Sequence, residues 1–277
     1  MDEHTRSLEI DVNVVRRTLV DFVRTEITRA GLQRAVVGVS GGLDSALACF
    51  LAAEALGPDN VLAVRMPYRA SSPDSLEHAA LVIQQTGVHG VTVPITPMAD
   101  PFFASIPEDQ AIRRGNVLAR LRMIVLYDRS AEFQGLVVGT GNKTEILLGY
   151  TTLYGDSACA FNPVGDLYKT QVRQLARAME VPEVILAKPP SADLWAGQTD
   201  EGELGFTYAR VDQLLTLLVD GRYAPDACVE AGFDRAFVKA VLEWVRRNHF
   251  KRVLPPIARL SPRTAEDDLL PLKDWGA

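Results

Sequence analysis

The chain has 277 residues, of which 47% are hydrophobic and 23% are charged, and its formal net charge is −6. This composition is typical of a globular α/β protein with a sizeable core, and the acidic balance argues against a protein that mainly binds nucleic acid nonspecifically. No apolar run reaches the roughly 18 residues of a membrane span, and the polar N-terminus lacks the basic and then apolar plan of a signal peptide.

In chain order, apolar residues at helical spacing first predict a helix over residues 12–30. Short apolar runs then alternate with helical patterns. The predicted strands cover residues 35–39, 61–66, 90–95 and 136–140, and the predicted helices cover residues 43–56, 73–86 and about 116–133. After residue 165 the pattern is helical, near residues 168–179, 207–219 and 233–248. This order predicts a parallel sheet with helices on both faces and with ligands at the carboxyl ends of its strands.

The segment Ser40-Gly41-Gly42-Leu43-Asp44-Ser45 connects the first predicted strand to the following helix. Glycines allow backbone N–H groups to approach a ligand closely, and the start of a helix favours an anion, so this turn is suited to phosphate. Asp44 would repel phosphate, but it fits if a divalent cation lies between the carboxylate and the phosphate. A tight turn with Asp and Ser as helix caps is the alternative.

The pattern SGGxDS at the end of the first strand resembles the loop of the pyrophosphatase-loop ATPases. Members of that superfamily cleave ATP between its α- and β-phosphates and attach AMP to their substrate. The resemblance therefore implies an ATP site that includes Gly38, Val39, Ser40, Gly41, Gly42, Leu43, Asp44 and Ser45.

Further blocks resemble one family of this superfamily, the ammonia-dependent NAD synthetases. They are RRGNVLARLRM at 113–123, VVGTGNKTE at 137–145, YGD at 154–156, NPVGDLYKTQV at 162–172, KPPSADLWAGQTDEGELGFTY at 188–208 and FKRVLPP at 250–256. The resemblance implies a Rossmann-like fold of the adenine nucleotide alpha-hydrolase type, and a homodimer. It also implies conversion of deamido-NAD, ATP and ammonia into NAD, AMP and pyrophosphate through an adenylated nicotinate carboxylate.

The resemblance also assigns roles around ATP. It implies that Asp44 and Glu145 bind Mg²⁺ and that Thr140, Lys169 and Ser191 contact ATP. Two carboxylates together with phosphate oxygens suit a hard cation, and a lysine in the first turn of a helix needs a compensating anion. Local structure offers alternatives: Glu145 would favour a helix N-terminus, Lys169 would be a surface lysine, and Ser191 would be an N-cap.

For deamido-NAD, the resemblance implies contacts from Arg120 and Lys251. A solvated basic helix face is the alternative for Arg120, and a basic run that only complements a helix C-terminus is the alternative for Lys251. No pair of a nucleophile and a base stands out, and we assign no catalytic residue, since ATP and ammonia supply the reacting groups.

Two substitutions alter the expected substrate site. Many family members have a lysine and an aspartate where this chain has Leu153 and Ala160. The ATP half of the motif set is intact, whereas the deamido-NAD half is changed. The polar segment from Trp195 to Phe206 is predicted to be a mobile loop, and the family resemblance implies that it closes over the site.

The whole chain is expected to be a single domain with its core at 12–262 and an acidic tail at 264–277 of unassigned role. Cys49, Cys159 and Cys228 form no CxxC pair, which favours reduced thiols in the cytoplasm. With no recognisable glutaminase segment, we expect ammonia as the nitrogen donor, and no nucleic-acid or membrane partner. A related ligase that acts on another carboxylate or on tRNA, and a non-catalytic ATP-binding module, are the alternatives.

Overall fold

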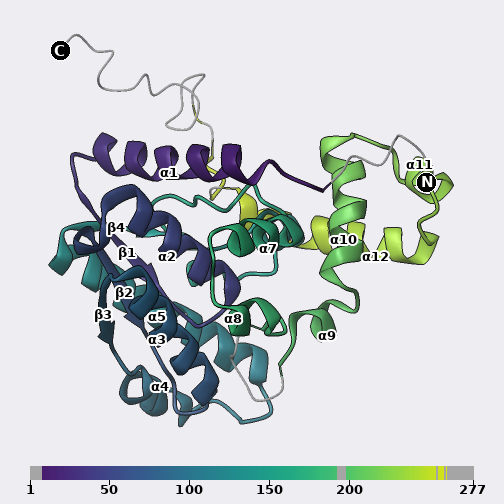
Figure 1. The fold of residues 1–277 in the computed structure, drawn as a ribbon. Coiled ribbons are helices and arrows are strands. Elements are labelled where there is room, and N and C mark those ends of the chain that lie inside the picture. The colour runs from purple at the N-terminus through teal and green to yellow at the C-terminus, as the bar shows by residue number, and fades with distance from the viewer. Residues whose placement is uncertain (1–7, 192–197, 254, 259, 261–277) are drawn as a thin grey trace.

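The computed structural model describes residues 8–191, 198–253, 255–258 and 260. Within these residues, four parallel strands form a sheet of order β3-β2-β1-β4 (Figure 1). The strands are β1 (Arg34–Gly38), β2 (Val61–Arg65), β3 (His89–Thr92) and β4 (Gly135–Val138). In the central strand, Val36 lies opposite Leu62 of β2 and opposite Val137 of β4. From β1 the chain adds β2 and β3 on one side and then crosses to add β4 on the other side. The segments that follow β1 and β4 therefore lie side by side at the carboxyl ends of the strands, where such sheets bind ligands.

Helices cover both faces of this sheet, because successive strand residues point to opposite sides. Ala35 and Val37 belong to one hydrophobic core, and Val36 and Val64 belong to another. The first core includes α1 (Val12–Arg29), α2 (Leu43–Leu56), α3 (Pro73–Thr86) and α7 (Lys169–Ala178), and the second includes α4 (Thr96–Phe103) and α5 (Ala111–Phe133). The predicted α/β fold with a parallel sheet between helices is confirmed.

A group of C-terminal helices lies beside the sheet, at the right of Figure 1. It contains α10 (Tyr208–Leu215), the π-helical turn η2 (Thr216–Asp220), α11 (Pro225–Glu230), α12 (Arg235–Arg247) and η3 (His249–Arg252). Shorter elements are η1 (Pro58–Asn60), α6 (Lys143–Leu148), α8 (Glu183–Ala187) and α9 (Asp200–Leu204). Leu148 of α6 and Tyr168, which precedes α7, are buried in the core of the C-terminal group and so attach it to the sheet.

Several sequence-based boundaries differ from the structure by one or two residues, and three differ by more. Helix α5 begins at Ala111 rather than near Asn116. The sequence does not predict its first turn because that part of the helix is largely exposed and has no clear apolar periodicity. Strand β3 ends at Thr92, although Val93 N and Ile95 N beyond it still donate to Arg65 O and Pro67 O. The segment expected to be a loop up to Phe206 instead contains α9, capped by Thr199, whose hydroxyl accepts from Gly202 N.

Residues 192–197 and the expected tail at 264–277 lie outside the described residues. In the described part of the chain, no helix is both long enough and apolar enough to cross a membrane. Cys49 and Cys228 are buried, whereas Cys159 is only half-buried, and all three are free thiols.

Candidate functional site

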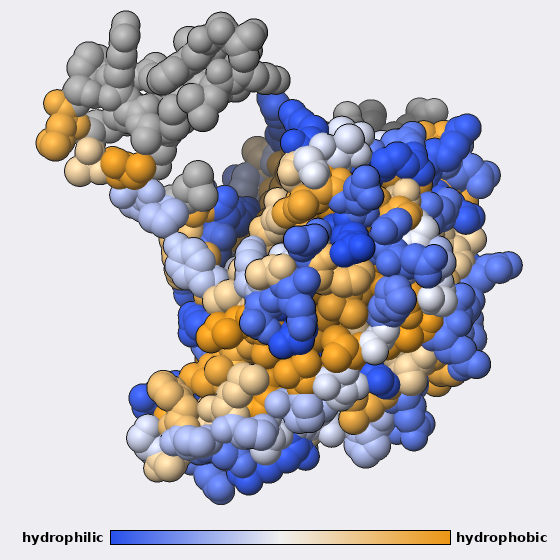
Figure 2. Space-filling view, turned by 90° about the vertical axis from the view of Figure 1, so that its left-hand side faces the viewer, coloured by the Kyte–Doolittle hydropathy of each residue, from blue (hydrophilic) through white to orange (hydrophobic). Residues whose placement is uncertain are grey.

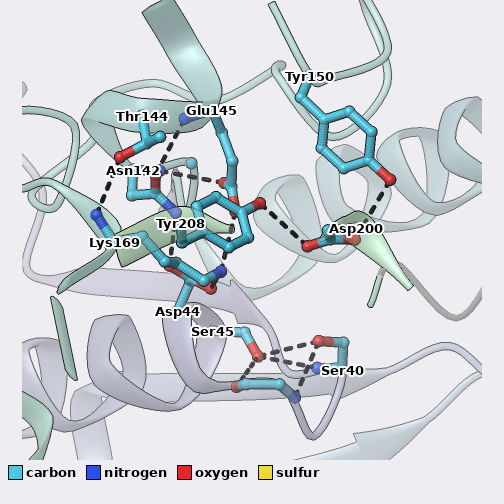
Figure 3. A network of polar contacts seen from close by, with 12 residues as sticks. Ser40, Asp44, Ser45, Asn142, Thr144, Glu145, Tyr150, Lys169, Asp200 and Tyr208 are labelled. Atoms are coloured by element: carbon cyan, nitrogen blue, oxygen red, sulfur yellow. Dashed lines mark hydrogen bonds and ion pairs between the residues drawn. The ribbon is translucent and has the colours of Figure 1, made fainter. Parts of the chain in front are cut away.

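The glycine-rich turn between β1 and α2 is held in shape by its own serines (Figure 3). Ser40 N donates to Ser45 Oγ over 3.2 Å, Gly42 N donates to Ser40 Oγ over 3.3 Å, and Ser45 Oγ donates to Gly42 O over 3.0 Å. Gly41 has a φ of 79°, and a Cβ there would lie 2.2 Å from the carbonyl oxygen of Ser75. Gly42 is the N-cap of α2 and provides no capping side chain. The first turn of α2 therefore keeps N–H groups that an anion can accept.

Two acidic side chains from distant segments meet at Lys169, beside this turn (Figure 3). Its Nζ lies 2.5 Å from Asp44 Oδ2 of α2 and 3.0 Å from Glu145 Oε1 of α6. Lys169 is itself the first residue of α7 and is 5% exposed. The structure thus brings these three predicted site residues together, although they are separated by up to 125 residues along the chain.

A third carboxylate, Asp200 of α9, belongs to the same electrostatic cluster. It accepts a hydrogen bond from Tyr208 Oη over 3.1 Å and one from Tyr150 Oη over 3.3 Å. Burial, opposed mainly by Lys169, raises the pKa of Asp200. Sequence reasoning missed this residue, since no motif distinguishes it from the other acidic residues of its segment.

The cluster contains more negative than positive charge. Burial lowers the pKa of Lys169, but Asp44 and Glu145 more than offset it, so the pKa is raised and the ammonium stays charged. Burial, opposed by Lys169 and reinforced by Asp44 and Asp200, raises the pKa of Glu145 to about 7. A buried group of carboxylates with too little positive charge favours an additional cation.

Asn142 fixes the geometry of the two carboxylates on Lys169. Its Oδ1 accepts from Glu145 N over 3.0 Å and its N donates to Glu145 Oε2 over 3.3 Å, which is a capping box at the start of α6. Its Nδ2 also donates to Asp44 Oδ1 over 2.9 Å. Asn142 was not among the predicted site residues, but the spacing Asn-x-x-Glu is a capping signal that would have indicated it.

A buried carboxylate behind the site connects the first turns of α6 and α7. Asp212 of α10 is 0% exposed. It accepts from Thr144 Oγ1 over 2.6 Å, from Thr170 N over 2.9 Å and from Thr170 Oγ1 over 2.8 Å. Thr144 Oγ1 in turn accepts from Lys169 N over 3.0 Å. The N–H groups that begin α7 are therefore satisfied by side chains of two other helices.

Asp44, Glu145, Lys169 and Asp200 line one cavity of about 510 Å³. Of the predicted ATP and metal residues, those that line it are Gly38, Val39, Ser40, Gly42, Leu43, Asp44, Ser45, Thr140, Glu145, Lys169 and Ser191. Gly41 is not among the lining residues, in keeping with its close packing against Ser75. Arg65, at the end of β2, also lines the cavity, and its buried Nε has no hydrogen-bond partner within the described residues. The strand-end position of Arg65 is the signal that could have identified it.

The two predicted deamido-NAD residues lie in different places. Lys251 lines the cavity, and its Nζ donates to Gly149 O and to Thr151 O, each over 2.7 Å. Burial lowers its pKa. Arg120 is exposed and does not line the cavity, and its Nε and Nη2 donate to Leu153 O over 3.3 and 3.2 Å.

Comparison with known proteins gives a consistent set of relatives. A family model described as NAD synthase matches residues 15–255. A relative from Trichlorobacter lovleyi named NH(3)-dependent NAD(+) synthetase is 55% identical over 269 residues, which cover 97% of this chain and 98% of the relative. Two solved structures are similar in fold. NMN synthetase from Francisella tularensis has a TM-score of 0.80 at 31% identity, with 91% of this chain and 100% of that chain covered. NH3-dependent NAD synthetase from Campylobacter jejuni, in complex with the nitrate ion, has a TM-score of 0.77 at 32% identity, with 90% and 100% covered.

Proposed function

The chain belongs to the NAD synthase family, and from this premise we propose that it catalyses the ATP-dependent amidation of deamido-NAD by ammonia. An oxygen of the nicotinate carboxylate attacks the α-phosphorus of ATP, which releases pyrophosphate and leaves an acyl-adenylate. The nitrogen of ammonia then attacks the carbonyl carbon, AMP leaves with the bonding electrons, and a proton is lost. The products are NAD, AMP and pyrophosphate.

The convergence of Asp44, Glu145 and Lys169 beside a glycine-rich turn is the observation that best supports this function. A module that only binds ATP needs the turn, but it has little use for a buried ammonium held between two carboxylates. Such an ammonium is suited to an anion that gains charge during a reaction, which pyrophosphate does as it leaves.

We propose that the phosphates lie against the start of α2. The N–H groups there, with the hydroxyls of Ser40 and Ser45, would bind phosphate oxygens, and Lys169 would hold the departing pyrophosphate. Thr140 and Ser191 line the same cavity and are proposed ATP contacts. This arrangement accelerates the reaction by orientation and charge neutralisation, and it requires no nucleophile from the protein.

We further propose that Asp44 and Glu145 hold Mg²⁺ when ATP binds. The two carboxylates fit a hard cation, and the excess negative charge around Lys169 supports one. Among the described residues, no group of three or more His, Cys, Asp or Glu side chains is arranged to hold a metal ion, so phosphate oxygens and water would have to complete the coordination of a cation on Asp44 and Glu145. Bound there, the ion would neutralise the charge of the phosphates.

On the substrate side, we propose that Lys251 holds the cavity wall through its two carbonyl contacts and lies next to deamido-NAD. Arg120 lies outside the cavity, so it is proposed to contact a part of deamido-NAD that extends beyond it. The Francisella structure supports a second candidate product, NMN, which would form from nicotinate mononucleotide by the same chemistry.

We also propose a homodimer. The face turned towards the viewer in Figure 2 contains an apolar area bordered by polar side chains. Helix α5 exposes three large apolar residues: Ile112 at 72%, Ile124 at 54% and Tyr127 at 42%. Exposed apolar groups of this kind favour a protein interface. The three free cysteines support a reducing compartment such as the cytoplasm.

The function is tested by supplying ATP, Mg²⁺ and ammonium with either deamido-NAD or nicotinate mononucleotide. We expect NAD from the dinucleotide, with one AMP and one pyrophosphate per NAD, and no product when ammonia-free glutamine replaces ammonium. Preferential formation of NMN would support the second candidate. ATP binding without release of pyrophosphate in either reaction would contradict both and would indicate a non-catalytic module.

A further inference from the structure

One wall of the cavity comes from the C-terminal helices. Trp244 and Arg247 of α12 and Asn248 and Lys251, which follow α12, all line the space that also contains the glycine-rich turn. They are about 200 residues away from that turn in the chain, and the sequence motifs of the ATP site do not include them.

The wall is fixed firmly to the segment that follows Glu145. Asn248 Nδ2 donates to Leu148 O over 3.1 Å. Gly149 has a φ of 66°, and a Cβ there would lie 2.2 Å from Asn248 Cβ, so only glycine allows this approach. The rings of Tyr150 and Trp244 pack edge to face with centroids 6.4 Å apart. These contacts hold Trp244 in a defined position relative to the site.

Within the described residues, Arg247 is the cation of this wall that keeps the most free donors. Its guanidinium lies over the Trp244 ring, 4.8 Å from the centroid. Among the residues that the structure describes, it forms no ion pair, whereas the ammonium of Lys251 already donates to two carbonyl groups. Burial lowers the pKa of Lys251, Asp156 opposes this, and repulsion from Arg247 adds to the lowering, so Arg247 lies close enough to Lys251 to act on the same ligand.

Other candidate contacts for the substrate lie outside this cavity. Leu153 and Ala160 have no charge, and neither they nor Arg120 line the cavity. A pyridine nucleotide contains phosphate groups, and a guanidinium can donate two parallel hydrogen bonds to a phosphate. We propose that Arg247, held over the indole of Trp244, binds a phosphate of the pyridine-nucleotide substrate. This rests on the proposed function.

The test compares Arg247→Ala with Arg246→Ala. Arg246 is the adjacent residue of α12, is also exposed, and does not line the cavity. We expect Arg247→Ala to raise the KM for deamido-NAD by about tenfold or more, since one charge-assisted contact is lost. The KM for ATP should change by less than about twofold, because the ATP contacts are separate. Arg247→Lys should recover only part of the loss, since an ammonium lacks the paired donors. Arg246→Ala should match the wild type.

A second measurement keeps the inference independent of turnover. Calorimetric titration of deamido-NAD into the wild type, in the presence of a non-hydrolysable ATP analogue, should give a Kd that Arg247→Ala weakens by a similar factor. Equal Kd values for deamido-NAD in Arg247→Ala and Arg246→Ala would overturn the inference. It would also be overturned if Arg247→Ala raised the KM for ATP as much as the KM for deamido-NAD. If the wild type binds deamido-NAD but forms no amide from it, the proposed function fails while the role of Arg247 is still tested by the titration.

Discussion

Asp212→Asn should destabilise the protein and weaken ATP use, although Asp212 contacts no reacting group. The carboxylate faces three donors: the hydroxyls of Thr144 and Thr170 and the backbone N–H of Thr170. An amide keeps one acceptor oxygen and replaces the other with a donor. At least one buried donor then loses its acceptor.

The magnitude follows from these contacts. A buried donor left without a partner costs about 1–3 kcal/mol, and loss of a negative charge at the start of α7 costs about 0.3–1 kcal/mol. We therefore expect the free energy of unfolding to fall by about 2–3 kcal/mol. Because Thr144 Oγ1 also accepts from Lys169 N, the first turn of α7 should shift and the KM for ATP should rise.

Urea unfolding followed by circular dichroism, together with steady-state kinetics, measures both effects. Asp234→Asn is the matched control, since Asp234 is the N-cap of α12 and accepts from Phe237 N at an exposed position. Asn is as good an N-cap as Asp, so this control should be nearly neutral. If the free energies of unfolding of Asp212→Asn and Asp234→Asn differ by less than about 0.5 kcal/mol, the idea that Asp212 anchors the starts of α6 and α7 is refuted.

Three further predictions concern the carboxylates and the wall of the cavity. Asp44→Asn and Glu145→Gln should each lower kcat by about 10²-fold or more. If both carboxylates act on one cation, the loss of kcat in the double variant should be far smaller than the product of the two single losses. A loss equal to that product would argue against a shared ion. In the folded protein the pKa of Glu145 is raised from 4.5 to about 7, so the folded state holds a proton there that the unfolded state has lost. In metal-free protein the free energy of unfolding should therefore fall as the pH rises from about 4.5 to about 7. Denaturation curves measured at a series of pH values should show this slope in the wild type and a flatter one in Glu145→Gln. Gly149→Ala should lower the free energy of unfolding by about 3 kcal/mol, because backbone strain adds to overlap with Asn248. Gly205 has a similar φ of 81° but lies in open space, so Gly205→Ala should lower the free energy of unfolding by less in the same assay. Equal losses for the two variants would mean that the contact with Asn248 is unimportant.

Much of the fold follows from patterns that are local in the sequence. The alternation of short apolar runs with helical patterns predicts a parallel sheet, because β-branched runs and Ala- and Leu-rich runs have different periods. The turn from Ser40 to Ser45 predicts an anion site, because two glycines before a helix leave its first N–H groups accessible. Asp44, Glu145 and Lys169 were assigned to one site from motifs, and parallel strands bring such motifs together at one edge of the sheet.

Other parts of the site depend on packing between distant segments, which no local pattern specifies. Asp200 reaches the cluster because α9 packs beside Tyr150 and Tyr208. Arg247 lines the cavity because α12 packs against the segment after α6, where Gly149 permits close approach to Asn248. In the sequence, Arg246 and Arg247 are equivalent basic residues at the end of a helix. Only the rotation of that helix against the rest of the protein places one of them in the cavity and leaves the other outside it, because residues adjacent on a helix point about 100° apart.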